Sequence, residues 1–153
     1  MKTLVLGLGN PILSDDGVGF YVIEQLNAKI NKPGVTFAES SASGLRLLEE
    51  IVDYDKLIII DAIQTAEGKA GEVYRLNPED LDKTRRTLSS HGLSFADALA
   101  LGKKVGLALP QQITIFAAEV KDISTFSSHC TPEVEKAIPK LVDMVIWELS
   151  ESG

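Results

Sequence analysis

An apolar strand that runs straight into a glycine-bracketed turn is the feature that most constrains this chain. Residues 4–8 are Leu-Val-Leu-Gly-Leu, and the turn that follows carries Asp15 and Asp16 side by side before Gly17. Such apolar runs are typical of buried strands in parallel sheets. A phosphate-binding turn relies on backbone N–H groups and a helix N-terminus, and two carboxylates would oppose that positive potential. The turn therefore favours a cation or a proton over a phosphate.

The spacing of apolar residues along the chain predicts an α/β fold. Strands are predicted over residues 4–8, 35–38, 57–60, 72–76 and 113–118. Helices are predicted from Asp16, over residues 43–51, over residues 93–101 up to Gly102, and from Pro132 almost to Gly153. Strands and helices that alternate in this way build a parallel sheet. We therefore expect a three-layer sandwich, with helices on both faces of a mostly parallel, twisted sheet of about five strands.

Size and composition limit the number of domains and the class of partner. A chain of 153 residues, 44% of them hydrophobic, fits a single domain over residues 1–153. The formal net charge of −7 argues against binding to nucleic acid or to an anionic membrane surface. Cys130 is the single cysteine, and the N-terminal residues resemble neither a signal peptide nor a membrane span. A cytoplasmic protein without membrane insertion is predicted.

Two strand ends that carry carboxylates are expected to meet at one edge of the sheet. In a doubly wound βαβαβ unit, the first and third strands are neighbours about 4.8 Å apart, and their carboxyl ends share a crevice. The first strand leads to Asp16, and the third ends in Asp61. At roughly 5 Å and an effective dielectric of about 20, two carboxylates repel each other by about 3 kcal/mol. A bound cation, a Lys or Arg partner, or protonation of one carboxyl would offset this repulsion.

A histidine is the third member of the candidate site. His91 follows two serines in a segment that has to cross the carboxyl edge of the sheet before the next helix begins. One imidazole and two carboxylates make an open metal site, which suits Zn²⁺, Ni²⁺ or Co²⁺ better than Ca²⁺. Each residue also has an ordinary structural interpretation: Asp16 as a helix N-cap, Asp61 as a carboxylate that binds loop amides, and His91 as a loop histidine.

Four stretches of the chain resemble the nickel-iron hydrogenase maturation endopeptidases. The run from Gly7 to Gly19, GLGNPILSDDGVG, resembles the N-terminal signature of that family. The other three stretches are Ile60-Asp61-Ala62, then Ser90-His91-Gly92-Leu93 with Asp97-Ala98-Leu99, and finally Thr131-Pro132-Glu133-Val134. Their order and spacing hold over nearly the whole chain, so the resemblance covers the single predicted domain.

The resemblance implies an endopeptidase that removes the C-terminal extension of a hydrogenase large-subunit precursor after nickel has been inserted. It assigns both metal binding and catalysis to Asp16, Asp61 and His91. It also implies that the nickel belongs to the precursor and that no resident cofactor is required, while Zn²⁺ or Cd²⁺ would occupy the same ligands in vitro. Many relatives carry Glu where this chain has Asp16, so the ligand oxygen would lie about one methylene further back.

Two other enzyme classes share part of the first turn. Peptidyl-tRNA hydrolases also have a Gly-Leu-Gly-Asn-Pro turn after a first strand, but they need a catalytic histidine soon afterwards. This chain continues with residues 15–17, Asp-Asp-Gly, and its first histidine is His91. A dinucleotide-binding turn would have its third glycine where this chain has Ile12. Both classes therefore fit the sequence less well than the maturation endopeptidases.

Two further alternatives concern the loop near the C-terminus and a role without catalysis. His129 and Cys130 are adjacent, and neighbouring loop residues usually point apart, which argues against a thiol dyad; a lone cysteine more often packs as a small hydrophobe. A metal-sensing chaperone of the hydrogenase precursor would use the same three ligands without hydrolysis. Only a test for cleavage distinguishes that chaperone from a peptidase.

Overall fold

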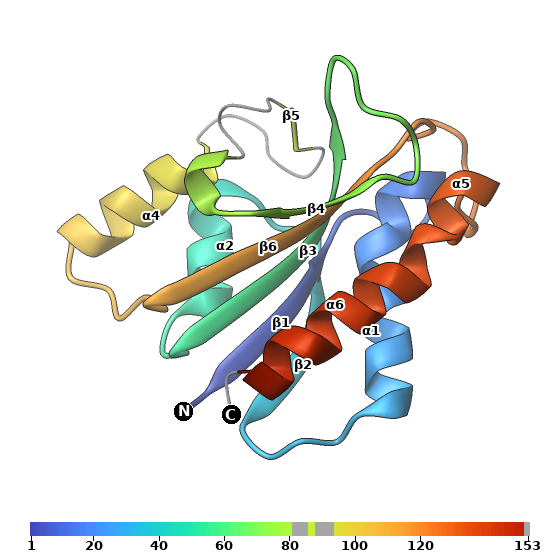
Figure 1. The fold of residues 1–153 in the computed structure, drawn as a ribbon. Helices are drawn as coiled ribbons and strands as arrows, with labels where there is room; N and C mark the ends of the chain where they lie inside the picture. Colours follow the sequence, from blue (N-terminus) through green and yellow to red (C-terminus); the bar gives the residue numbers. More distant parts are fainter. Residues whose placement is uncertain (81–85, 88–93, 152–153) are drawn as a thin grey trace.

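The computed structural model describes residues 1–80, 86–87 and 94–151 (Figure 1). Its centre is a sheet with the strand order β2-β1-β3-β6-β4, and the short strand β5 pairs with β3. The strands are β1 (Thr3–Leu8), β2 (Val35–Ser40), β3 (Lys56–Gln64), β4 (Val73–Leu76), β5 (Arg86–Thr87) and β6 (Gln112–Glu119). β2, β1, β3 and β6 are parallel, whereas β4 and β5 are antiparallel to their neighbours. The predicted α/β class and mostly parallel sheet are confirmed.

Helices cover both faces of this sheet, which gives the three predicted layers (Figure 1). The helices α1 (Val18–Lys29) and α6 (Ala137–Glu151) pack on one face, and α2 (Gly44–Ile51) and α4 (Phe95–Lys104) pack on the other. In β3, Ile58 and Ile60 belong to the core under α1 and α6, whereas Leu57 and Ile59 belong to the core under α2 and α4. Because the strand is buried on both faces, its central residues 57–60 form a continuous apolar run.

The helix ends differ from the predicted ones in three places. A 3-10 turn, η1 (Ser14–Gly17), precedes α1, so the α-helix begins at Val18 rather than at Asp16. Gly102 does not stop α4, since it is buried within the helix beside the side chains of α2 and the following loop. The last helix is divided into α5 (Pro132–Glu135) and α6. Pro139 lies in the first turn of α6, where a missing N–H is tolerated.

Part of the predicted crossing segment, including His91, lies outside the described residues. In residues 1–80 and 94–151, no helix combines the length and the apolar character that a membrane crossing requires.

Candidate functional site

The first turn wraps tightly enough to bring Asp16 back over the end of β1. Gly9 has φ +140°, and a Cβ there would collide with the carbonyl oxygen of Asp16 and lie 3.6 Å from its Oδ1. The N–H of Asn10 donates to that same carbonyl oxygen at 3.1 Å. Only glycine allows this approach, because a side chain would have no room. The glycine that ends the first strand therefore sets the position of the buried Asp16 carboxylate.

Asp61 lies at the same edge of the sheet, on the neighbouring strand. Gly7 of β1 pairs with Ile60 of β3, and Asp61 is the next residue of β3. It is buried, and its Oδ1 accepts a hydrogen bond from the N–H of Ala62 at 2.8 Å. A Cβ on Gly19 would lie 2.6 Å from the Ile60 carbonyl oxygen, which shows how closely the start of α1 covers the ends of β1 and β3. Asp16 thus lies over the end of β1, and Asp61 lies in β3 one residue beyond its last pair with β1, at the switch point of the sheet.

The two ordinary structural interpretations of these aspartates fare differently. Asp16 is not the N-cap of α1, because that position belongs to Gly17. Asp61 does accept a hydrogen bond from a backbone amide, but that amide belongs to Ala62, a residue of β3 and not of a loop. His91, the third predicted ligand, lies outside the described residues, so its part in the site remains a prediction. Within residues 1–80 and 94–151, no three His, Cys, Asp or Glu side chains gather in a way that would hold a metal ion.

Asp15 has a different partner set from Asp16, although the two are neighbours in η1. Its fully buried carboxylate accepts hydrogen bonds from the N–H groups of Lys121 (3.1 Å) and Asp122 (3.0 Å). It also accepts from the N–H of Thr131 at 2.6 Å and from the hydroxyl of Thr131 at 3.0 Å. One carboxylate therefore joins both ends of the loop 120–131 to η1. Asp15 holds the backbone that carries Asp16.

A further buried carboxylate at this edge was not singled out from the sequence. Glu119, the last residue of β6, accepts hydrogen bonds from the N–H and the hydroxyl of Thr65, both at 2.8 Å, and from the Tyr74 hydroxyl at 3.0 Å. Burial raises the pKa of Tyr74 to about 12, and its hydrogen bond to Glu119 acts in the same direction, so the phenol stays a donor. The sequence pattern that could have identified Glu119 is its place at the end of an apolar strand, and Asp61 lies near the end of its own strand.

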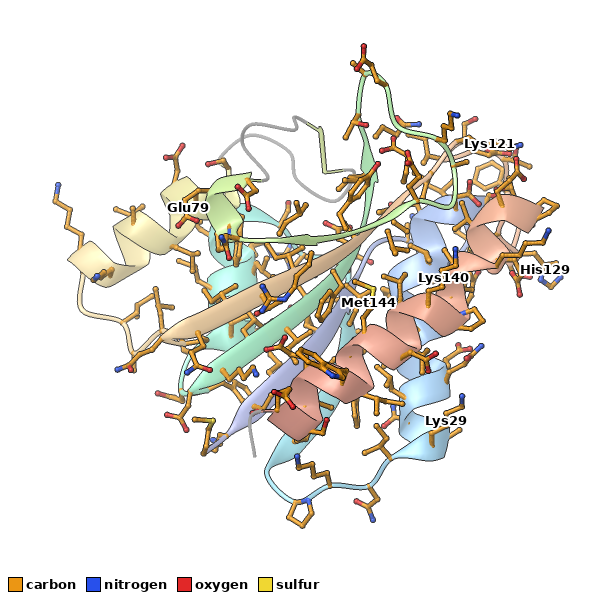
Figure 2. The ribbon with its side chains drawn as sticks, in the orientation of Figure 1. Lys29, Glu79, Lys121, His129, Lys140 and Met144 are labelled. Carbon is orange, nitrogen blue, oxygen red and sulfur yellow. The ribbon has the colours of Figure 1, made fainter. Side chains whose placement is uncertain are left out.

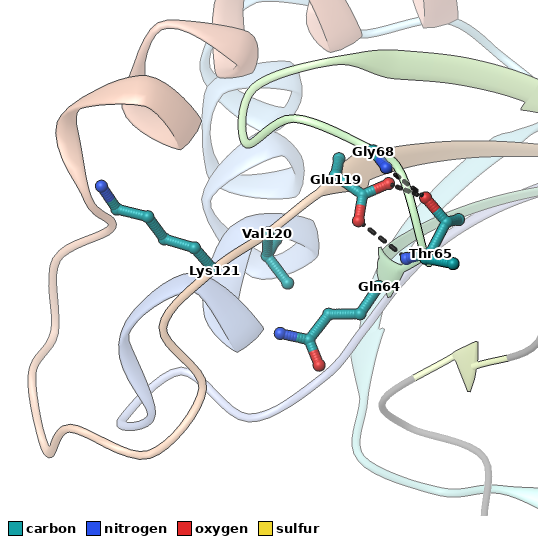
Figure 3. Close-up of a pocket in the computed structure, with 7 residues that line it drawn as sticks. Gln64, Thr65, Gly68, Glu119, Val120 and Lys121 are labelled. Carbon is teal, nitrogen blue, oxygen red and sulfur yellow. Dashed lines mark hydrogen bonds between the residues drawn. The ribbon is translucent and has the colours of Figure 1, made fainter.

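Glu119 lines a hollow at the carboxyl ends of β3 and β6 (Figure 3). The hollow has a volume of about 470 Å³ and opens to solvent. Gln64 and Lys121 line it together with Glu119, and the chain between β3 and β4 closes one side at Gly68, where a Cβ would collide with the Glu119 carboxylate. Polar side chains and this volume are compatible with a segment of polypeptide. The hollow begins three residues beyond Asp61 along β3.

The adjacent His129 and Cys130 do not form a reactive thiol pair. Burial raises the pKa of the Cys130 thiol to about 12, and the charges of Asp15 and Glu135 add to the shift. A thiol with that pKa carries almost no thiolate at neutral pH. The His129 side chain is exposed on the outer side of the loop after β6 (Figure 2), where its carbonyl oxygen accepts from the Ser14 hydroxyl at 3.1 Å. The expectation that Cys130 packs as a small hydrophobe agrees with its place beside the α1 and α6 core.

Comparison with protein families gives one match that covers most of the chain. Residues 20–148 match the model of a family described as hydrogenase maturation protease. The hydrogenase 2 maturation protease of Escherichia coli strain K12 is 30% identical over 155 residues, which cover 100% of this chain and 93% of that protein.

Solved structures agree with that match. The hydrogenase maturating endopeptidase HybD from E. coli superposes with a TM-score of 0.85 at 30% identity, over 100% of this chain and 94% of the other. The NiFe hydrogenase maturation protease HybD from Thermococcus kodakarensis is similar with a TM-score of 0.68 at 25% identity, over 95% of this chain and 97% of the other. The likeness in both cases extends over nearly the whole of each chain.

Proposed function

Because the chain belongs to the hydrogenase maturation protease family, we propose that it is an endopeptidase acting on the large-subunit precursor of a nickel-iron hydrogenase. The reaction removes the C-terminal extension of the precursor after nickel insertion. The nickel is part of the substrate, and the enzyme needs no resident cofactor. The net charge of −7 supports a protein partner over nucleic acid, and we assign the reaction to the cytoplasm.

The observation that carries this proposal is the placement of two buried carboxylates where the pairing of β1 and β3 ends, Asp16 in the turn after β1 and Asp61 in β3. Neighbouring carboxylates disfavour each other's charged form, whereas a cation between them favours the charged form of both. A metal in the precursor would supply the positive charge at the moment of binding. Recognition of the nickel and positioning of the scissile bond then become one event.

The chemistry of the proposed reaction is the hydrolysis of one peptide bond. Asp16, Asp61 and His91 bind the precursor's metal and hold the nearby peptide at the carboxyl edge of the sheet. Water adds its hydroxyl to the carbonyl carbon, the C–N bond breaks, and the departing nitrogen takes up a proton. The three side chains contribute orientation and charge, which lower the barrier by fixing the reacting groups in place.

Incubation with two forms of the same precursor tests the proposal. The precursor is prepared with and without nickel, mixed with the protein, and followed by intact mass. We expect the nickel-loaded form to lose the mass of its C-terminal extension and the nickel-free form to stay intact. Binding of the nickel-loaded form without any loss of mass would instead identify a metal-sensing chaperone. Equal cleavage of both forms would contradict recognition of nickel.

A further inference from the structure

Two large apolar side chains stand exposed beside the candidate site. Ile12, in the turn after β1, is 56% exposed, and Phe126, in the loop 120–131, is 82% exposed. Exposed apolar side chains that lie together mark contact surfaces more often than single exposed ones do. Both residues belong to connections at the carboxyl ends of strands, the edge at which Asp16 and Asp61 lie.

The backbone holds these two residues next to each other. The N–H of Ser127 donates to the carbonyl oxygen of Ile12, and the N–H of Ser14 donates to the carbonyl oxygen of Ser127, both at 3.0 Å. Leu13 and Ser127 therefore form a parallel bridge. Residues one position before a bridged parallel pair lie on the same side of it, which puts Ile12 beside Phe126.

The same backbone connects the pair to Asp16. The N–H of Asp16 donates to the carbonyl oxygen of Leu13 at 3.1 Å, so Ile12 directly precedes the 3-10 turn that carries the aspartate. Asp15 also fixes the loop 120–131, which carries Phe126, because its carboxylate accepts hydrogen bonds from both ends of that loop. A protein that presents a peptide bond at Asp16 is therefore within reach of Ile12 and Phe126.

We propose that Ile12 and Phe126 form a docking surface for an apolar segment of the hydrogenase precursor, close to the peptide bond that is cut. This inference rests on the proposed function and adds the side chains that recognise the protein part of the substrate. The occupant is the precursor rather than a second copy of this chain, because two side chains bury far less than the roughly 800 Å² per partner of a stable complex. Ile12 and Phe126 alone do not hold the precursor; they add to the contacts that other parts of the precursor make with the protein.

Steady-state kinetics with the nickel-loaded precursor test the docking surface. We expect Phe126→Ser and Ile12→Ser each to raise KM about 10-fold or more and to leave kcat within about 2-fold, because the lost contact is the same in the bound substrate and the transition state. Both side chains are exposed, so the thermal unfolding curves of the variants should match that of the wild type. Phe126→Leu should keep most of the affinity.

Trp147 supplies a matched control. It is 62% exposed on α6, and its neighbour Glu148 pairs with Lys56 at the first residue of β3, so it lies towards the opposite edge of the sheet. Trp147→Ser should leave both KM and kcat unchanged.

The outcomes separate this inference from the proposed function. If the wild type cleaves the precursor and Phe126→Ser has an unchanged KM, the docking surface is wrong and the peptidase stands. If the wild type does not cleave, the peptidase is wrong, and direct binding of the nickel-loaded precursor still tests the surface, with a Kd at least 10-fold weaker expected for Phe126→Ser. A wild-type dimer that Phe126→Ser converts to a monomer would assign the surface to self-association and overturn the proposal.

Discussion

Asp15 and Asp16 are neighbours in sequence but differ in what surrounds their carboxylates. Asp15 faces the loop 120–131 and accepts hydrogen bonds from three backbone N–H groups and one hydroxyl. Asp16 lies over Gly9, at the end of β1. Two adjacent side chains in a 3-10 turn point in different directions, so one can stabilise the turn while the other serves the site. Substitution of Asp15 should therefore mainly lower stability, whereas substitution of Asp16 should mainly abolish precursor processing.

Removal of the Asp15 carboxylate should mainly affect stability. Asp15→Ala leaves the N–H groups of Lys121, Asp122 and Thr131 without their acceptor, and each buried donor left this way costs about 1–3 kcal/mol. Because three donors lose their acceptor together, we expect the free energy of unfolding, measured by urea denaturation, to fall by about 3 kcal/mol or more. Asp16→Asn is the matched variant: we expect a change under about 1 kcal/mol together with loss of precursor processing. An Asp15→Ala protein as stable as the wild type would contradict the anchoring role.

The residue scale is also where sequence reasoning was least complete. It selected both aspartates of the turn and placed a helix start at Thr131-Pro132, which the structure has. Thr131 is the N-cap residue of α5, but its hydroxyl makes no capping hydrogen bond and donates to Asp15 instead. The partner lies 116 residues away in the chain. A local pattern contains no information about a contact of that range, and the Glu119 network was missed for the same reason.

At the scale of elements, two glycines let α1 pack directly on the sheet. A Cβ on Gly19 would lie 2.6 Å from the Ile60 carbonyl oxygen and 2.7 Å from the Leu8 carbonyl oxygen. A Cβ on Gly7 would collide with the Gly19 carbonyl oxygen in return. These neighbours are backbone atoms of β1, β3 and α1, which cannot move aside as a flexible side chain can. The close contact sets the height of η1, and with it Asp16, above the strand ends.

Gly19→Ala should therefore destabilise the protein, even though alanine is the better helix former. We expect a loss of about 1–3 kcal/mol or more from overpacking, which a lower midpoint of thermal unfolding would report. Gly102→Ala is the control, because it is also a helical glycine but meets only the ends of leucine side chains, the nearest at 3.0 Å. At Gly102 the higher helix propensity of alanine offsets the cost of a small displacement of the leucine side chains. The free energy of unfolding should therefore change by no more than about 1 kcal/mol. Equal effects at both positions would argue against the backbone contact.

An ion-pair network holds α6 to the sheet at the edge opposite the site. Glu148 accepts from the buried Lys56 of β3 at 2.9 Å and from Arg75 of β4 at 3.2 Å. Burial alone would raise the pKa of Glu148, but the hydrogen bonds and charges of Lys56 and Arg75 lower it below its ordinary value of 4.5. The network therefore stabilises the protein fully above pH 4.5, and this contribution is lost as the pH falls through the lowered pKa.

Glu148→Gln should test this network through its pH dependence. Removal of one partner of a buried pair costs about 3–5 kcal/mol, so we expect a loss of that order in the free energy of unfolding near pH 7. The difference between variant and wild type should shrink as the pH is lowered below 4.5, because the wild-type carboxyl also becomes neutral. Denaturation curves collected from pH 3 to pH 7 measure it. A difference that does not depend on pH would show that packing, rather than charge, is the cause.

For the whole molecule, the strand order does what the βαβαβ rule predicts. β1 and β3 are neighbours, and the residues that follow their paired ends include both candidate carboxylates. The rule combines the right-handed crossover, which is nearly universal, with the doubly wound strand order 2-1-3, so the sequence pattern was sufficient once that order was adopted. The antiparallel direction of β4 and the pairing of β5 with β3 carry no local signal and were not predicted. Helix ends such as Gly102 depend on tertiary packing, which local patterns do not contain.

The pH dependence of processing is a property of the whole site. Histidine binds a metal only as neutral imidazole, and its ordinary pKa is about 6.5. If His91 binds the precursor's nickel, the rate at limiting precursor should fall as the pH drops below about 6.5. Cleavage rates measured between pH 5 and 8 report this, with circular dichroism as a check that the protein stays folded. A flat profile over that range would argue against an imidazole ligand.

The central claim is that Asp16, Asp61 and His91 converge on one metal ion. A crystal structure of the protein soaked with Cd²⁺ tests this most directly, because the ion is easily located and accepts the same nitrogen and oxygen donors. The account predicts one Cd²⁺ in contact with both carboxylates and the imidazole. An ion bound elsewhere, with the His91 imidazole too far from the two aspartates to share a ligand, would contradict it.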